Sequence, residues 1–234
     1  MSETEYSAAE LGSLVLYADN HLLAVGKPAG LLSQDSGTGL RNLEDWAREW
    51  VRVDKNKEGN VFLNAVHRID KVVSGVVLFA RTSKALSRLN EDVRKRNCKK
   101  IYHALVEGVP ERSSAELVHW LSHEHHCAEV CREGDKGAQR AVLRYRTLQQ
   151  IDKLTLLEVD LETGRYHQIR AQLASIGCPI AGDERYGARL VSDGRDIALH
   201  HFQLEINHPT TREAIVIKAP YPAGSGWWSQ VPAS

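Results

Sequence analysis

Residues 67–82 read HRIDKVVSGVVLFART and join a charged loop to an apolar run. Asp70 follows Arg68 by two residues, and a Ser-Gly pair then leads into residues 76–80, VVLFA. A short, continuous apolar run of this kind is typical of a strand that is buried on both faces. The carboxylate of Asp70 would lie at the edge of that strand, where lost hydration and nearby cations control its ionisation. On this segment alone, Asp70 is either a reactive acid or a residue that only caps the turn.

The rest of the chain predicts a single mixed α+β domain around the strand at residues 76–80. Asn42 precedes a helix with acids in its first turn, and Ser83 is expected to cap a second helix. A third helix is expected at residues 165–176, where apolar side chains recur at helical spacing before a glycine. Apolar patterns predict further strands in a hairpin at residues 14–25 and at residues 101–107, 138–149, 154–161, 198–206 and 214–218.

The composition excludes several classes of protein. Of the 234 residues, 42% are hydrophobic and 26% are charged, an ordinary balance for a globular protein. The net charge is zero, so an RNA partner would have to bind through a local basic face. Four cysteines form no disulfide framework in a chain of this size, and no apolar signal segment follows the acidic start. We therefore expect a cytoplasmic protein that does not interact with membranes.

Two further segments follow HRIDKVVSG along the chain: KKIYHALVEG at residues 99–108 and TGRYHQIRAQLASIGCPIAGDERYG at residues 163–187. Together the three segments resemble the signature of the RluA-type pseudouridine synthases, and similar patterns extend from about residue 14 to residue 221. The resemblance implies an α+β fold with a mixed, mainly antiparallel, bent sheet flanked by helices. The catalytic domain is expected at residues 14–222, between tails at residues 1–13 and 223–234. Because about a dozen residues precede the first strand, we expect no S4-type RNA-binding domain.

The resemblance also implies an activity: the isomerisation of uridine in RNA, which moves the ribose bond from N1 to C5 of the base without a cofactor. By its place in the motif, Asp70 is the essential carboxylate, which attacks the sugar or the base, or removes a ribose proton. Arg170 is the cation that keeps this carboxylate ionised despite burial. Tyr102 is expected to pack on the uracil and to move a proton, unless it is only a core tyrosine. Arg68 is expected to fill the space of the flipped nucleotide, with a structural salt bridge as the alternative.

Residues 88–100, RLNEDVRKRNCKK, are rich in basic side chains. We predict that Arg94, Lys95 and Arg96 bind RNA phosphates on a positive face beside the active site, although such runs are often only solvated helix faces. The expected partner is a structured RNA, either tRNA or rRNA, with a slight preference for a compact target such as a tRNA arm. The enzyme is expected to be a monomer. The segment HWLSHEHHCAEVC at residues 119–131 lacks regular ligand spacing, so no metal site is expected.

Other functions fit the motifs less well. HRID differs from the kinase loop H-R-D because Ile69 intrudes, and no D-F-G or glycine-rich loop follows. A glycosidase would need a second carboxylate in a motif with Asp70. A catalytically silent RNA-binding module on the same fold is the alternative from another class, and the intact Asp70, Tyr102 and Arg170 argue against it. Departures from the family pattern occur outside these positions, at Val73, Tyr166, Gln172 and Cys178.

Overall fold

The computed structural model describes residues 12–37, 39–54, 59–124, 126–191, 196–223, 226–229 and 231. Within them, eleven strands form one sheet, in which β4 and β10 pair in parallel and the other neighbours are antiparallel. The path through the sheet is β1-β2-β4-β10-β5-β9-β8-β6-β7, with β3 on β4 and β11 on β10. The predicted mixed, mainly antiparallel α+β sheet is confirmed. The strands are β1 (Val15–Ala18), β2 (Leu22–Lys27), β3 (Asn64–Ala65), β4 (Ser74–Ala80), β5 (Lys99–Glu107), β6 (Ser114–Glu124), β7 (Cys127–Cys131), β8 (Gln139–Ile151), β9 (Leu154–Leu161), β10 (Leu199–Asn207) and β11 (Ala214–Lys218).

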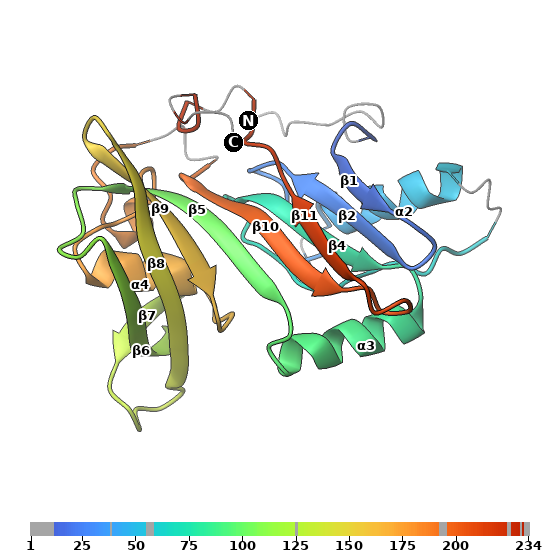
Figure 1. Cartoon of the computed structure of the whole chain (residues 1–234), viewed down its shortest axis with the longest axis horizontal. Coiled ribbons are helices and arrows are strands. Elements are labelled where there is room, and N and C mark those ends of the chain that lie inside the picture. The colour runs from blue at the N-terminus through green and yellow to red at the C-terminus, as the bar shows by residue number, and fades with distance from the viewer. Residues whose placement is uncertain are drawn as a thin grey trace.

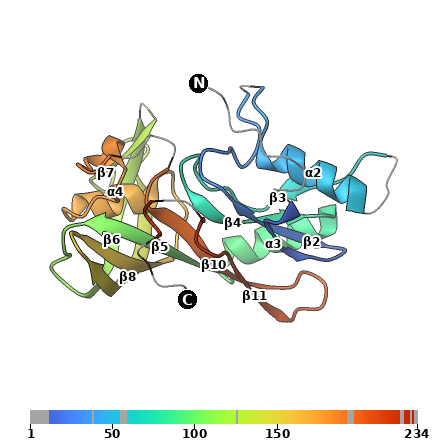
Figure 2. The same ribbon diagram turned by 90° about the horizontal axis from the view of Figure 1, so that it is seen from above.

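Strand β4 is covered on both faces, as its continuous apolar run predicted. All seven of its residues are buried. Val77 and Phe79 belong to the larger core with helix α2 (Leu43–Asp54), whereas Val76 and Leu78 pack in a second core with helix α3 (Ser83–Arg94). Because successive side chains of a strand point to opposite faces, the two helices lie on opposite sides of the sheet. Figures 1 and 2 show them flanking the part of the sheet built from β1, β2 and β4.

The opposite end of the sheet carries helix α4 (Gln168–Ser175), which lies beside β6 and β7 (Figure 1). The Ser-Gly pair at the start of β4 lets this strand approach β10 closely. Strand β10 then continues the sheet through β5 toward the end that carries α4. Gly75 has a φ of +119°, and a Cβ at this position would lie 2.3 Å from the carbonyl oxygen of His201. Only glycine fits such a contact, so this position fixes how β4 meets the centre of the sheet.

Two predicted helix starts are wrong, one by a single residue and the other by three residues. Helix α3 is capped by Thr82 rather than Ser83, because the Thr82 hydroxyl accepts the hydrogen bond of the Ala85 amide at 3.1 Å. Helix α4 begins at Gln168, not at residue 165. Its preceding residue, His167, has a φ of 48°, which is incompatible with a helix interior, and the Gln168 side chain accepts hydrogen bonds from the Arg165 amide and the Thr163 hydroxyl. Residues 163–167 are therefore a side-chain-braced turn.

The start of helix α2 was predicted correctly. Asn42 caps α2 by accepting a hydrogen bond from the Asp45 amide at 3.1 Å. No helix in the described part of the chain is long and apolar enough to cross a membrane.

Candidate active site

A cavity of about 560 Å³ opens between the two ends of the sheet. Its walls come from the loop after β2, the loop before β4, the turn and first residues of α4, and the short 3-10 helix η1 (Glu184–Tyr186). Asp70, Arg170 and Arg68 line it, so three of the predicted site residues share one cavity. Other ionisable groups that line it are Asp35, Lys71, His167, Asp183, Glu184, Arg185 and Asp196. A cavity of this volume is within the range that accommodates a small-molecule-sized group such as a nucleotide.

The loop that carries Asp70 is held by hydrogen bonds on both sides of the carboxylate. The hydroxyl of Ser33 donates to the carbonyl of Ile69 at 2.8 Å and accepts from the Ile69 amide at 3.2 Å. The amide of Val73 donates to the Asp70 carbonyl at 3.1 Å, and the amide of Gly30 donates to the Lys71 carbonyl at 2.7 Å. The backbone at Asp70 is thus fixed before any substrate arrives.

Arg170 joins Asp70 to a second carboxylate. Its Nη1 donates to Oδ2 of Asp70 at 3.2 Å, across 100 residues of sequence. Its Nε and Nη2 make a bidentate pair with Asp183, at 2.7 Å each, and its guanidinium lies 4.9 Å from the centre of the Tyr186 ring. The side chain of Arg170 is 6% exposed and that of Asp183 is 1% exposed, whereas that of Asp70 is 31% exposed. The cation is therefore buried and held from behind, while the carboxylate of Asp70 remains accessible from the cavity.

Tyr102 is close to Asp70 but does not line the cavity. It is 6% exposed, and its ring stacks on that of His201 with centroids 4.4 Å apart and planes 14° from parallel. Burial, and to a smaller extent the Asp70 carboxylate, raises the pKa of its hydroxyl well above the ordinary value. The phenol is therefore protonated at neutral pH. His67 accepts a hydrogen bond from the Leu78 amide at 3.3 Å, which ties the start of the Asp70 loop to β4.

Lys27 is a buried cation behind the Asp70 loop that the sequence did not reveal. The side chain is almost fully buried, and its Nζ donates to the carbonyls of Pro28, Leu31 and Lys71 at 2.9, 2.7 and 3.2 Å. Burial lowers the pKa of Lys27 to about 7, although the carboxylate of Asp70 acts in the opposite direction. Lysine is rarely buried, so a lysine before Pro28 carried no signal of this role.

Three more residues of the site were not predicted: His167, Asp183 and Tyr186. The Nε2 of His167 lies 2.9 Å from Nη1 of Arg170 and 3.4 Å from Oδ2 of Asp70. Burial and the charge of Arg170 lower the pKa of His167 to about 3. Asp183 and Tyr186 stand in the segment GDERYG, between two glycines with positive φ values. An acid near a motif arginine was the one signal that could have identified Asp183.

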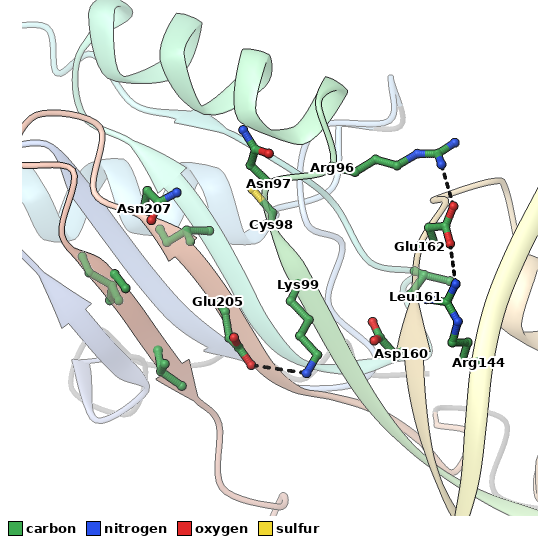
Figure 3. A pocket seen from close by; sticks show the side chains of 14 residues that line it. Arg96, Asn97, Cys98, Lys99, Arg144, Asp160, Leu161, Glu162, Glu205 and Asn207 are labelled. Carbon is green, nitrogen blue, oxygen red and sulfur yellow. Dashed lines mark hydrogen bonds and ion pairs between the residues drawn. The ribbon is translucent and has the colours of Figure 1, made fainter. Parts of the chain in front are cut away.

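Of the basic residues predicted to contact RNA, Lys95 and Arg96 line other pockets, whereas Arg68 lines the Asp70 cavity. Arg96 and Lys99 line a pocket of about 420 Å³. In it Arg96 pairs with Glu162, at 2.5 Å, and Lys99 pairs with Glu205, at 3.8 Å (Figure 3). Lys95 pairs with Glu91 at 2.7 Å, and Arg94 is exposed at the end of α3. Among the described residues, none of those lining this pocket also lines the Asp70 cavity. The basic cluster is thus partly neutralised, and its contact with RNA stays a prediction.

The histidine- and cysteine-rich segment forms the β6–β7 hairpin. His119 contacts the side-chain amide of Gln172, and the ring of His123 packs on Tyr166. Cys127 and Cys131 are free thiols on β7, and His125 lies outside the described residues. No group of three metal-ligating side chains occurs in the part of the chain that the structure describes.

Comparison with known proteins gives consistent matches. Residues 21–175 match a family model described as RNA pseudouridylate synthase. The chain is 34% identical to the uncharacterized RNA pseudouridine synthase YhcT of Bacillus subtilis, over 95% of this chain and 74% of that protein. It is 33% identical to ribosomal large subunit pseudouridine synthase C of Vibrio parahaemolyticus, over 91% of this chain and 67% of that protein. For ribosomal large subunit pseudouridine synthase D of Nitrosomonas europaea the identity is 32%, over 94% of this chain and 65% of that protein.

Solved structures with the same fold include two human proteins. Human RNA pseudouridylate synthase domain containing 4 aligns with a TM-score of 0.78 at 23% identity, covering 92% of this chain and 91% of that chain. Human RNA pseudouridylate synthase domain containing 1 aligns with a TM-score of 0.68 at 21% identity, covering 89% and 83%. These likenesses establish the fold.

Proposed function

Since this chain belongs to the RNA pseudouridylate synthase family and is an RNA pseudouridine synthase, we propose that it isomerises uridine with the carboxylate of Asp70 as the reacting group. One observation carries the proposal. The accessible carboxylate of Asp70 meets the buried guanidinium of Arg170 at 3.2 Å inside the cavity, although the two residues belong to motifs 100 residues apart.

The reaction needs a carboxylate and a closed space, and it needs no external reagent. The bond from C1′ of the ribose to N1 of uracil breaks, the base turns, and C1′ bonds to C5, which loses its hydrogen while N1 gains one. Atoms and electrons balance within the nucleotide. The target base must leave the RNA stack to enter the cavity. Asp70 then attacks the sugar or the base, or removes a ribose proton, and each of these routes requires the ionised carboxylate.

The neighbouring residues support this role. Arg170 donates a charge-assisted hydrogen bond to Asp70, and its pair with Asp183 prevents the guanidinium from turning away. Tyr102 is buried close to Asp70 with a phenol that stays protonated, so it can donate a proton or a hydrogen bond near the reacting carboxylate. Arg68 is exposed where it lines the cavity, a position from which its planar guanidinium can stack on bases beside the flipped uridine.

We propose rRNA of the large ribosomal subunit as the substrate. The names of the relatives from Vibrio parahaemolyticus and Nitrosomonas europaea favour it. The sequence alone favoured a compact target such as a tRNA arm. Pseudouridine mapping across total RNA, with and without the gene, separates the two, because the site that disappears on deletion identifies the substrate.

The role of Asp70 is tested by Asp70→Asn, which is nearly isosteric. We expect the fold to be kept and pseudouridine formation to be abolished, both in the purified enzyme and when the variant is returned to the deletion strain. Asp152→Asn makes the same chemical change at an exposed turn between β8 and β9 and serves as the control. An Asp70→Asn enzyme that works at the wild-type rate would exclude the proposed role, and a wild-type protein that binds RNA without converting uridine would favour a silent binding module.

A further inference from the structure

The hydroxyl of Tyr186 connects the β6–β7 hairpin to the candidate active site. It lies 2.9 Å from Nδ1 of His167 and accepts a hydrogen bond from the backbone amide of Ala128 in β7, also at 2.9 Å. The ring of the same tyrosine lies against the guanidinium of Arg170. Tyr186 thus contacts the cation that pairs with Asp70 and also the histidine beside that cation.

Counting donors and acceptors assigns the proton of His167. A guanidinium can only donate, so the Nε2 of His167, 2.9 Å from Nη1 of Arg170, must act as an acceptor. Burial and the charge of Arg170 keep the imidazole neutral, because they lower its pKa to about 3. The single ring proton therefore resides on Nδ1 and is donated to the Tyr186 hydroxyl.

The tautomer of His167 matters because its Nε2 lies 3.4 Å from Oδ2 of Asp70. With Nε2 unprotonated, His167 and Asp70 both accept from Nη1 of Arg170. A proton on Nε2 would instead point at Nη1 of Arg170 or at Asp70, and it would displace the guanidinium from the carboxylate. The orientation of Arg170 thus depends on which nitrogen of His167 carries the proton.

The backbone conformation of His167 also indicates that surrounding contacts fix the position of its ring. Its φ of 48° lies in the left-handed region, which costs a non-glycine residue of order 1 kcal/mol or more and persists only where the surroundings enforce it. The enforcing contacts are the stack of Tyr166 on the ring, with centroids 3.9 Å apart, and the hydrogen bond with Tyr186.

We propose that Tyr186 is a positioning residue: its hydroxyl holds His167 in the Nδ1-protonated tautomer and thereby keeps Arg170 directed at Asp70. This rests on the proposed function of Asp70, which Tyr186 reaches through His167 and Arg170. Tyr186 acts without touching the substrate. The β6–β7 hairpin contributes through the Ala128 amide, which occupies the second acceptor position of the hydroxyl.

The first test needs no substitution. The ¹⁵N chemical shifts of the His167 ring, measured on the wild-type protein at neutral pH, distinguish the two tautomers. We expect a protonated Nδ1 and an unprotonated Nε2. A proton on Nε2 in the wild-type protein would overturn the proposal, whatever the enzyme's activity.

The second test is Tyr186→Phe, which removes the hydroxyl and leaves the ring against Arg170. We expect His167 to shift toward the Nε2-protonated tautomer and kcat to fall at least tenfold, since a buried donor loses its acceptor. Affinity for RNA should be unchanged. Tyr145→Phe is the matched control, because it removes another largely buried tyrosine hydroxyl, one that donates to the Arg112 carbonyl outside the cavity.

Each outcome for Tyr186→Phe either supports or overturns the positioning role of Tyr186. A variant with the wild-type rate would overturn the proposal. A slow variant that keeps the proton on Nδ1 would also overturn it, because the loss would not act through His167. If wild-type protein has the expected tautomer but Asp70→Asn is fully active, then the proposed function of Asp70 fails while the tautomer assignment stands.

Discussion

At the scale of single residues, the reacting carboxylate depends on one buried cation. Arg170 is the partner of Asp70, at 3.2 Å. Because its guanidinium brings a positive charge and a hydrogen-bond donor to the reacting carboxylate, Arg170→Ala should reduce activity by orders of magnitude. Rates measured on one RNA substrate at neutral pH check this expectation.

The control for this variant follows from Asp183, whose side chain is 1% exposed. Removing Arg170 alone leaves the Asp183 charge buried and unpaired, a loss of about 3–5 kcal/mol of stability. The double variant Arg170→Ala, Asp183→Asn removes both charges and separates the effect on the reaction from the effect on folding. If the double variant folds and retains near wild-type activity, Arg170 does not contribute to the reaction.

Lys27 should give the folding free energy a distinct dependence on pH. Its pKa is about 7 in the folded protein and 10.5 in the unfolded chain, so between these values the unfolded state binds more protons. The contribution of Lys27 to stability therefore rises with pH in this window, by up to about 1.4 kcal/mol per pH unit, and is least favourable below pH 7. Lys27→Met should remove this rise, and urea unfolding at a series of pH values measures it.

Lys84→Met is the control for Lys27, because Lys84 is an exposed lysine on α3. Its replacement should leave the pH dependence of stability unchanged. Equal pH dependence in the wild-type protein and Lys27→Met would mean that the three carbonyls hold the ammonium of Lys27 charged throughout the window, against this prediction.

At the scale of elements, the strands that were predicted lie within two residues of their observed bounds, but β3, β6 and β7 were not predicted. Strand β9 has the predicted bounds because its apolar pattern ends at sharp turns. The turn before α4 escaped detection, since it depends on the Gln168 side chain and on a left-handed His167. Asp70 and Arg170 were found from their motifs, whereas the pair of Arg170 with Asp183 depends on burial that only the folded chain reveals.

Two groups of basic residues are candidates for contacts with RNA phosphates: those at the end of α3 and those that line the Asp70 cavity. The cations just after α3, Lys95 and Arg96, are paired with acids, whereas Arg68 and Arg185 line the cavity. We expect Arg68→Ala with Arg185→Ala to weaken RNA binding and to reduce the slope of log affinity against log salt by roughly two, one for each lost phosphate contact. The matched variant Arg94→Ala, Lys95→Ala, Arg96→Ala tests the originally predicted patch. A larger loss of slope in the triple variant would show that RNA crosses the end of α3.

At the scale of the whole molecule, the reacting loop is attached to the most protected strand. Both faces of β4 are covered by helices and both of its edges are paired, to β2 on one side and to β10 and β3 on the other. Its amide hydrogens should therefore exchange with solvent only when the whole domain opens, later than those of the β6–β7 hairpin. Hydrogen–deuterium exchange measured residue by residue checks this order.

The burial of β4 determines how the enzyme loses activity in denaturant. Many enzymes lose their active sites by local loosening well before the protein melts. Here the turn that bears Asp70 passes directly into β4 and is hydrogen-bonded to Ser33 and Lys27, so it cannot unfold separately from the strand. In a urea titration, activity and tertiary structure should disappear along one curve. A mild denaturant would then give a mixture of fully working and fully unfolded molecules, rather than a population of weakened catalysts.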